Sequence, residues 1–235
     1  MMWSNTVAFF RGHWQLFVLM SLIVVLWSTP VMVPLKITVV LLHELSHGVV
    51  GVATGGSIES LTISPQQGGQ VMLRGGSRFW TLTAGYLGSL LIGMGVFFAA
   101  LRSTLDRAVV AGMGLLFLAV AALYVRDAFA LFFCVGVAVL LLAMARWLDH
   151  RINDVVLRVI GLTSMIYVPF DIFSDTIARS HLQSDAWMLA DEFGGTTMLW
   201  GGLWLVLSLL AIGASLRYGL GASSNIAFSP ASKAD

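Results

Sequence analysis

Long apolar runs follow one another along almost the whole sequence, and they decide what this chain can fold into. A transmembrane α-helix needs about 20 consecutive, mostly apolar residues. Runs of about that length occupy residues 14–35, 36–54, 79–101, 108–125, 128–145, 155–177 and 197–216. Inside a bilayer a helix pairs its own backbone polar groups. The sequence therefore predicts an all-α polytopic, integral membrane protein with seven transmembrane helices, or six if the run at 36–54 is partly re-entrant.

The composition supports a lipid environment for most of the chain. Hydrophobic residues make up 58% of the 235 positions and charged residues 11%, against about 25% charged residues in typical soluble domains. The net charge of +1 gives no basic surface for nucleic acid. We therefore expect the lipid bilayer, and no nucleic acid, as a partner. The length fits one domain, residues 1–235, with a core at 36–217 and a polar tail at 218–235.

Residues 57–74 differ from the runs around them because apolar and polar residues largely alternate there. The apolar positions that carry this alternation are Leu61, Ile63, Val71 and Leu73. A period of two around a turn rich in Pro and Gly is typical of a β-hairpin. We expect a short hairpin directly after the second run, where its edge could pair with an extended peptide. The polar side chains that could line an inlet for water at this hairpin are Ser64, Gln66, Gln67 and Gln70.

The motif His43-Glu44-Leu45-Ser46-His47 lies inside the second run. On a helix, positions i and i+4 share one face, so the two imidazoles can bind one ion, as in the zincin signature. Zinc lowers the pKa of a bound water from about 15.7 to about 7, and Glu44 can take that water's proton as a general base. Ionisable groups inside a membrane segment are costly and indicate function. The alternative interpretation is that these two histidines and Glu44 form a hydrogen-bonded polar cluster between helices and bind no metal.

A catalytic zinc site usually has three protein ligands and one open position, so a third ligand must come from elsewhere in the chain. Asp171 is the first candidate, because an unpaired carboxylate within an apolar run is costly. Asp175 lies on the same helical face, and either carboxylate could bind the metal while the other supports it. Asp185 is better explained as a helix-capping residue and is the third candidate. The predicted Zn2+ ligands and the catalytic base are His43, His47 and Asp171, with Glu44.

Several stretches carry a resemblance to a known family. They are His43-Glu44-x-x-His47-Gly48, Thr54-Gly55-Gly56, Ala84-Gly85-Tyr86-Leu87-Gly88, and residues 171–179 and 184–186. Over about residues 36–217 the chain resembles the site-2 protease superfamily, and within it the M50B-like peptidase branch. The resemblance implies cleavage of a membrane-protein substrate within the bilayer, by zinc held by two histidines and an aspartate. Better-known members have Asn-x-x-Pro before the Asp and Gly after it. This sequence departs from that pattern, so the third ligand stays open.

Three functions agree with these features. The first is an intramembrane zinc metalloprotease that cuts in or near transmembrane segments. The second is a catalytically silent relative that acts as a membrane chaperone or adaptor, but the intact Glu44 argues against it. The third is a metal-ion transporter, but the sequence lacks the paired broken segments of inverted-repeat transporters.

Overall fold

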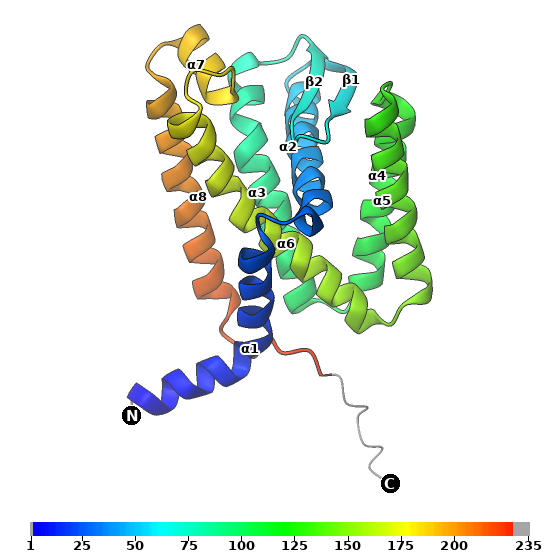
Figure 1. Cartoon of the computed structure of the whole chain (residues 1–235), viewed down its shortest axis with the longest axis vertical. Coiled ribbons are helices and arrows are strands. Elements are labelled where there is room, and N and C mark those ends of the chain that lie inside the picture. The colour runs from blue at the N-terminus through cyan, green and yellow to red at the C-terminus, as the bar shows by residue number, and fades with distance from the viewer. Residues whose placement is uncertain (1, 228–235) are drawn as a thin grey trace.

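The computed structural model describes residues 2–227 and is built mainly of long helices (Figure 1). The helices are α1 (Met2–Leu26), α2 (Val33–Ala53), α3 (Arg78–Arg102), α4 (Asp106–Tyr124), α5 (Ala128–Trp147), α6 (His150–Phe173), α7 (Asp185–Phe193) and α8 (Thr197–Gly219). The strands are β1 (Ser57–Ile63) and β2 (Gly69–Arg74). Two short helical turns, η1 before α2 and η2 after α6, are Pro30–Met32 and Ser174–Ala178.

Seven helical stretches within the described residues are long and apolar enough to cross a membrane. They comprise every helix except α7, with η1 joined to α2 and η2 joined to α6. The second run forms a continuous helix of 21 residues, so seven spans, rather than six, agree with the structure. The all-α, multi-pass membrane fold and the hairpin after α2 are confirmed.

The chain breaks between α1 and α2 at Pro30. The run expected at 14–35 is shared between two helices, because α1 ends at Leu26 and α2 begins at Val33. Pro30 has no backbone N–H and cannot continue a helix, and the Thr29 hydroxyl donates to the Leu26 carbonyl at 2.7 Å. After the break α2 enters the bundle, where 67% of its spanning window is buried, against 17% for α1.

The inner part of the bundle consists of α2, α3 and α6, and the other spans lie around them (Figure 1). Small residues let α3 and α6 approach closely. A Cβ atom at Gly93 would lie 2.3 Å from Ser164 Cβ, and one at Gly161 would lie 2.7 Å from Phe97 Cβ. The Ser164 hydroxyl also donates to the Ser89 carbonyl at 2.9 Å. Helices α3 and α6 therefore form a tightly packed pair, and α2 contacts both of them.

The hairpin lies along α2, at the same end of the bundle as α7 (Figure 1). Two glycines of α2 permit this contact. A Cβ atom at Gly48 would lie 2.8 Å from Ile58 Cδ1, and one at Gly51 would lie 2.7 Å from Leu73 Cδ1. The apolar side chains of both strands thus pack on the helix that carries the motif.

The two strands of the hairpin have different outer edges. They pair antiparallel with each other, ending at Ile63 opposite Gly69. The outer edge of β1 forms an isolated bridge between Leu61 and Val125, next to α5. Among the described residues no strand pairs with the outer edge of β2. That edge keeps backbone donors and acceptors available for another extended segment.

The polar stretch at 179–196, which we expected to be a loop, contains the short helix α7. Ser184 is its N-cap, and the Ser184 hydroxyl accepts from the Trp187 backbone N–H at 3.3 Å. The helix ends before Gly194, whose φ of +84° favours glycine. With nine residues α7 is too short to cross a bilayer, and it packs against the ends of α3 and α8.

The segment that follows α8 packs against α1. The backbone N–H of Ser224 donates to the Gly12 carbonyl at 2.9 Å, and the Ser224 hydroxyl lies 2.7 Å from His13 Nδ1. Part of the polar tail expected at 218–235 is therefore attached to the bundle, and residues 228–235 lie outside the part of the chain that the structure describes.

Candidate metal centre

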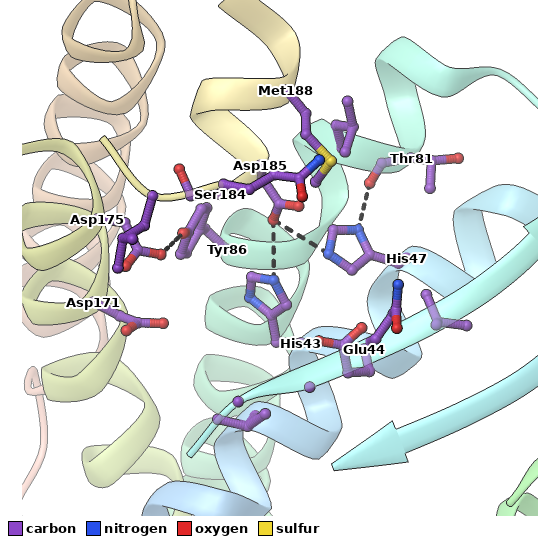
Figure 2. A pocket seen from close by; sticks show the side chains of 18 of the residues that line it. His43, Glu44, His47, Thr81, Tyr86, Asp171, Asp175, Ser184, Asp185 and Met188 are labelled. Atoms are coloured by element: carbon purple, nitrogen blue, oxygen red, sulfur yellow. Dashed lines mark hydrogen bonds and ion pairs between the residues drawn. The ribbon is translucent and has the colours of Figure 1, made fainter. Parts of the chain in front are cut away.

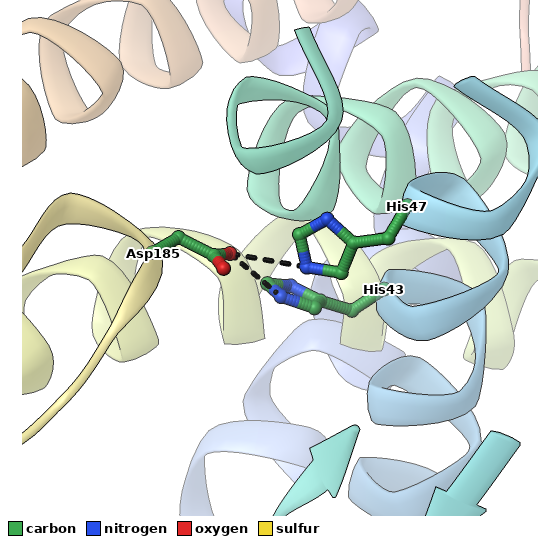
Figure 3. A group of neighbouring side chains, drawn as sticks. All are labelled: His43, His47 and Asp185. Carbon is green, nitrogen blue, oxygen red and sulfur yellow. Dashed lines mark ion pairs between the residues drawn. The ribbon is translucent and has the colours of Figure 1, made fainter. Parts of the chain in front are cut away.

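Helix α2 brings the two histidines of the motif together, and α7 brings a carboxylate to them (Figure 3). His43 Nε2 lies 3.0 Å and His47 Nε2 lies 3.2 Å from the same oxygen, Oδ2 of Asp185. The candidate ligand atoms of the three residues all lie within 4.8 Å of one another. Atoms bound to a tetrahedral zinc ion at about 2.0–2.1 Å lie roughly 3.3 Å apart. The two distances to Asp185 Oδ2 therefore fit a shared metal ion.

The burial and charge of the Asp185 carboxylate favour the binding of a cation beside it. Its side chain is 8% exposed, and the two imidazole nitrogens are the partners that the described residues 2–227 offer its Oδ2. Burial alone raises the pKa of a carboxyl group, but the adjacent imidazoles of His47 and His43 outweigh burial and hold the pKa of Asp185 below its usual range. A buried carboxylate is costly unless positive charge lies close to it. Two imidazole nitrogens and one carboxylate oxygen are a donor set found in catalytic zinc sites.

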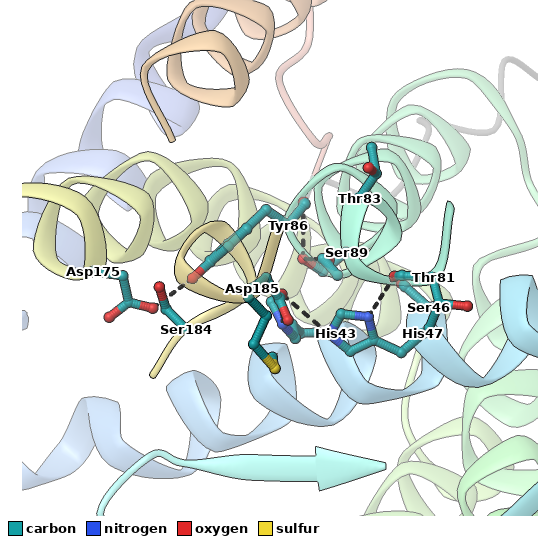
Figure 4. A network of polar contacts seen from close by, with 12 residues as sticks. His43, Ser46, His47, Thr81, Thr83, Tyr86, Ser89, Asp175, Ser184 and Asp185 are labelled. Atoms are coloured by element: carbon teal, nitrogen blue, oxygen red, sulfur yellow. Dashed lines mark hydrogen bonds and ion pairs between the residues drawn. The ribbon is translucent and has the colours of Figure 1, made fainter. Parts of the chain in front are cut away.

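Helix α3 orients the imidazoles from the other side (Figure 4). His47 Nδ1 lies 2.7 Å from the Thr81 carbonyl oxygen. When Nδ1–H donates to that oxygen, the lone pair of the ring is on Nε2, which faces Asp185. One turn further along α3, a Cβ atom at Gly85 would lie 2.4 Å from His43 Nε2 and 2.5 Å from His47 Cε1. Gly85 therefore leaves the space that both rings occupy.

Glu44 lies beside the imidazoles and is 5% exposed (Figure 2). Strand β2 comes so close to it that a Cβ atom at Gly69 would lie 2.5 Å from Glu44 Oε1. Glu44 lines a cavity of about 680 Å³, and the three candidate ligands line the same cavity. A buried carboxylate thus shares one space with the candidate ligand atoms, an arrangement that suits a general base.

The cavity is lined by α2, β2 with its turn, α3, the end of α6, η2 and α7. Three of the four polar side chains expected at a water inlet line it, namely Gln66, Gln67 and Gln70. The fourth, Ser64, stabilises the turn instead, because its hydroxyl accepts from the Gly68 backbone N–H at 3.2 Å. Polar groups therefore lie along one wall of a space that reaches Glu44.

The structure groups another carboxylate with the two histidines than the one we put first. Asp171 lines the cavity but lies outside the group of candidate ligand atoms. Asp175 has other partners: its Oδ2 accepts from the Tyr86 hydroxyl at 2.5 Å, and its Oδ1 accepts from Arg179 at 2.7 Å. Asp185 is the carboxylate that reaches both imidazoles, so the geometry favours it as the third ligand.

Thr81 and Tyr86 are neighbours of the site that the sequence reasoning missed. Thr81 acts through its backbone carbonyl, which every residue has, so no sequence signal marks it. Tyr86 packs edge-on against His43, with ring centroids 4.8 Å apart, and its hydroxyl binds Asp175. The sequence marked Tyr86 only as part of the stretch that resembles the family.

A comparison with protein-family models gives one match for this chain. The family described as Peptidase M50B-like matches residues 16–215, a segment that runs from α1 into α8 and contains every residue of the candidate metal centre. No curated protein and no solved structure matches the chain. M50 peptidases are zinc metalloproteases, and the group of His43, His47 and Asp185 could hold a metal ion. The chain therefore belongs to the M50B-like peptidase family, a branch of the site-2 protease superfamily.

Proposed function

We propose that this protein is an intramembrane zinc metalloprotease that hydrolyses peptide bonds in or near the transmembrane segments of membrane proteins. The observation that carries the proposal is the convergence of His43, His47 and Asp185 beside the buried Glu44. Both histidines and Glu44 lie in a helix that can cross a membrane. Membership of a peptidase family supports hydrolysis of a peptide bond.

In this proposal His43, His47 and Asp185 would hold the zinc ion. When bound, zinc supplies the Lewis acidity that makes water a nucleophile near neutral pH and polarises the carbonyl group to be attacked. Three protein ligands would leave one position for water or substrate, and all three residues line the cavity through which either could enter. The Thr81 carbonyl keeps His47 in the tautomer that has Nε2 free to bind.

Glu44 acts as the general base. Its carboxylate accepts a proton from the attacking water and donates it to the nitrogen of the leaving amine as the C–N bond breaks. Strand β2 limits where this side chain can lie, because the Glu44 carboxylate occupies the space that a side chain at Gly69 would take. The hairpin therefore positions the base as well as bordering the cavity.

The free edge of β2 is the proposed docking place for the substrate. A helical substrate keeps its amides in internal hydrogen bonds, so its scissile segment must unwind before hydrolysis. An extended segment along β2 regains backbone hydrogen bonds by β-addition. It also runs beside the cavity wall formed by residues 69–73. The glutamines of the turn supply a polar route for the water.

The zinc content of detergent-purified protein tests the choice of ligands. Wild type should hold about one zinc ion per chain. Asp185→Asn should lose the metal, because a neutral amide replaces the carboxylate at the two imidazoles. Asp171→Asn and Asp175→Asn are matched controls that should retain it. Zinc retained by Asp185→Asn and lost by Asp171→Asn would contradict the assignment and restore Asp171 as the third ligand.

A further inference from the structure

Three residues on one face of α3 lie near the candidate metal centre. Two of them contact the imidazoles, and the third has not yet been assigned a role. Arg78, Thr81 and Gly85 are spaced by three and four residues, so they lie on the same side of the helix. Thr81 and Gly85 act on the imidazoles directly. Arg78, at the start of α3, contacts α7 instead. Its Nε donates to Glu192 Oε1 at 2.8 Å, and one of its terminal nitrogens lies 3.1 Å from the Met188 sulfur.

The three candidate ligands differ in how they reach the centre. His43 and His47 belong to one continuous helix, so their spacing is fixed as soon as α2 forms. Asp185 is the first residue of α7, a separate helix of nine residues. A non-helical segment precedes α7, and Gly194 and Gly195, with φ of +84° and +90°, follow it. The position of Asp185 therefore depends on contacts that α7 makes with its neighbours.

Those contacts come mainly from the start of α3 and the start of α8. The ring of Phe193 packs edge-on against Phe79, with centroids 5.4 Å apart, and Trp200 Nε1 donates to the Gly194 carbonyl at 2.9 Å. Both attach the far end of α7. The ion pair of Arg78 and Glu192 adds a charged contact, and Met188 brings Arg78 to the turn that follows Asp185. Arg78 therefore connects α7 to the start of α3 at two points.

We propose that Arg78 is a positioning residue for the candidate metal centre, which holds α7 through Glu192 and Met188 so that Asp185 reaches His43 and His47. The inference rests on the proposed zinc ligands and does not require proteolysis. In this inference Arg78 controls the position of Asp185, the third ligand, while α2 alone fixes the two histidines. Breaking the ion pair then weakens zinc binding without removing any ligand.

The size of the effect follows from where the pair lies. The side chains of Arg78 and Glu192 are 51% and 36% exposed, and an exposed ion pair contributes little to the stability of a fold. A partner that orients a metal ligand has a larger influence on metal affinity. We therefore expect the zinc dissociation constant to rise roughly three- to tenfold when the pair is broken. The melting temperature of the zinc-free protein should hardly change.

Zinc affinity measured by chelator competition on the full-length, detergent-purified protein tests this inference, with zinc alone as the probe. The variants are Arg78→Ala, Glu192→Gln and the reversed pair Arg78→Glu with Glu192→Arg. Arg74→Ala is the matched control, because it breaks another exposed ion pair, to Glu59 at 2.6 Å, on the hairpin. Thermal unfolding of each zinc-free protein separates loss of fold from loss of positioning.

The expected result is weaker zinc binding in both single variants, recovery in the reversed pair and no change in Arg74→Ala. Unchanged affinity in Arg78→Ala and Glu192→Gln would overturn the inference, as would an equal loss in the control or an equal loss of stability in the zinc-free variants. Wild type that binds no zinc would overturn both this inference and the proposed function. Wild type that binds zinc but cleaves nothing would overturn the proposed proteolysis alone.

Discussion

The two imidazoles of the candidate centre face α3 at Gly85, the position where any side chain would enter the metal site. An added Cβ atom there would lie 2.4–2.5 Å from atoms of both rings, well inside van der Waals contact. His43 and His47 could be predicted from the sequence because a spacing of four residues on a helix is a local property. Gly85 could be recognised only by resemblance, since its requirement comes from another helix.

Substitution of Gly85 tests this arrangement. Gly85→Ala should lower zinc affinity by about tenfold or more, because the methyl group displaces both rings. Gly95→Ala on the same helix is the control, since a Cβ atom there meets nothing within 4 Å. Zinc content and circular dichroism, measured on both proteins, give the comparison. Normal zinc binding by Gly85→Ala would show that the imidazoles do not lie as described.

Two small elements, the hairpin and α7, complete the site around α2, and they differed in how far the sequence could predict them. The hairpin follows from its period of two and its Pro- and Gly-rich turn. Helix α7 has a start signal in Ser184 and a stop signal in Gly194, but nine residues between polar neighbours also fit a loop. Because the sequence did not predict α7, it gave no reason to place Asp185 next to the motif, and Asp171 was predicted as the third ligand instead.

The contact between strand β2 and Glu44 can be tested by adding a methyl group at Gly69. Gly69→Ala should slow cleavage by about a hundredfold while zinc content stays normal, because the methyl group displaces the base and touches no ligand. Gly68→Ala is the neighbouring control, since its Cβ atom would meet only the Ser64 hydroxyl at 3.3 Å. If Gly69→Ala lost zinc in step with activity, the hairpin would hold the metal centre together rather than position the base.

The arrangement of the whole bundle depends on packing that hydropathy does not reveal. Helix α5 is the most apolar span, yet 22% of its window is buried, whereas α2 is the least apolar and is 67% buried. Lipid tails are as apolar as a protein core, so an apolar helix gains little by lying inside. The sequence therefore predicted six or seven transmembrane helices but not which of them surround the site. Gly93 and Gly161, where α3 and α6 touch, mark the inner helices.

Close packing of α3 on α6 should be sensitive to a single methyl group. Gly93→Ala and Gly161→Ala should each lower the free energy of unfolding by about 1–3 kcal/mol, because each added Cβ atom collides with the facing helix. Gly136→Ala on α5, where a Cβ atom meets nothing within 4 Å, should change it little. Unfolding in detergent, followed by circular dichroism, measures all three. Equal stability of the three variants would contradict this packing.

Cleavage by Glu44→Gln tests the proposed function most directly. Purified wild type and variant are reconstituted in lipid vesicles with a transmembrane-helix substrate, and their zinc content is measured in the same preparations. We predict cleavage by wild type, a loss of about 10²- to 10⁴-fold in rate in Glu44→Gln, and equal zinc in both. Cleavage that is unaffected by Glu44→Gln, or a wild type that holds zinc and cleaves no transmembrane substrate, would contradict the proposed function.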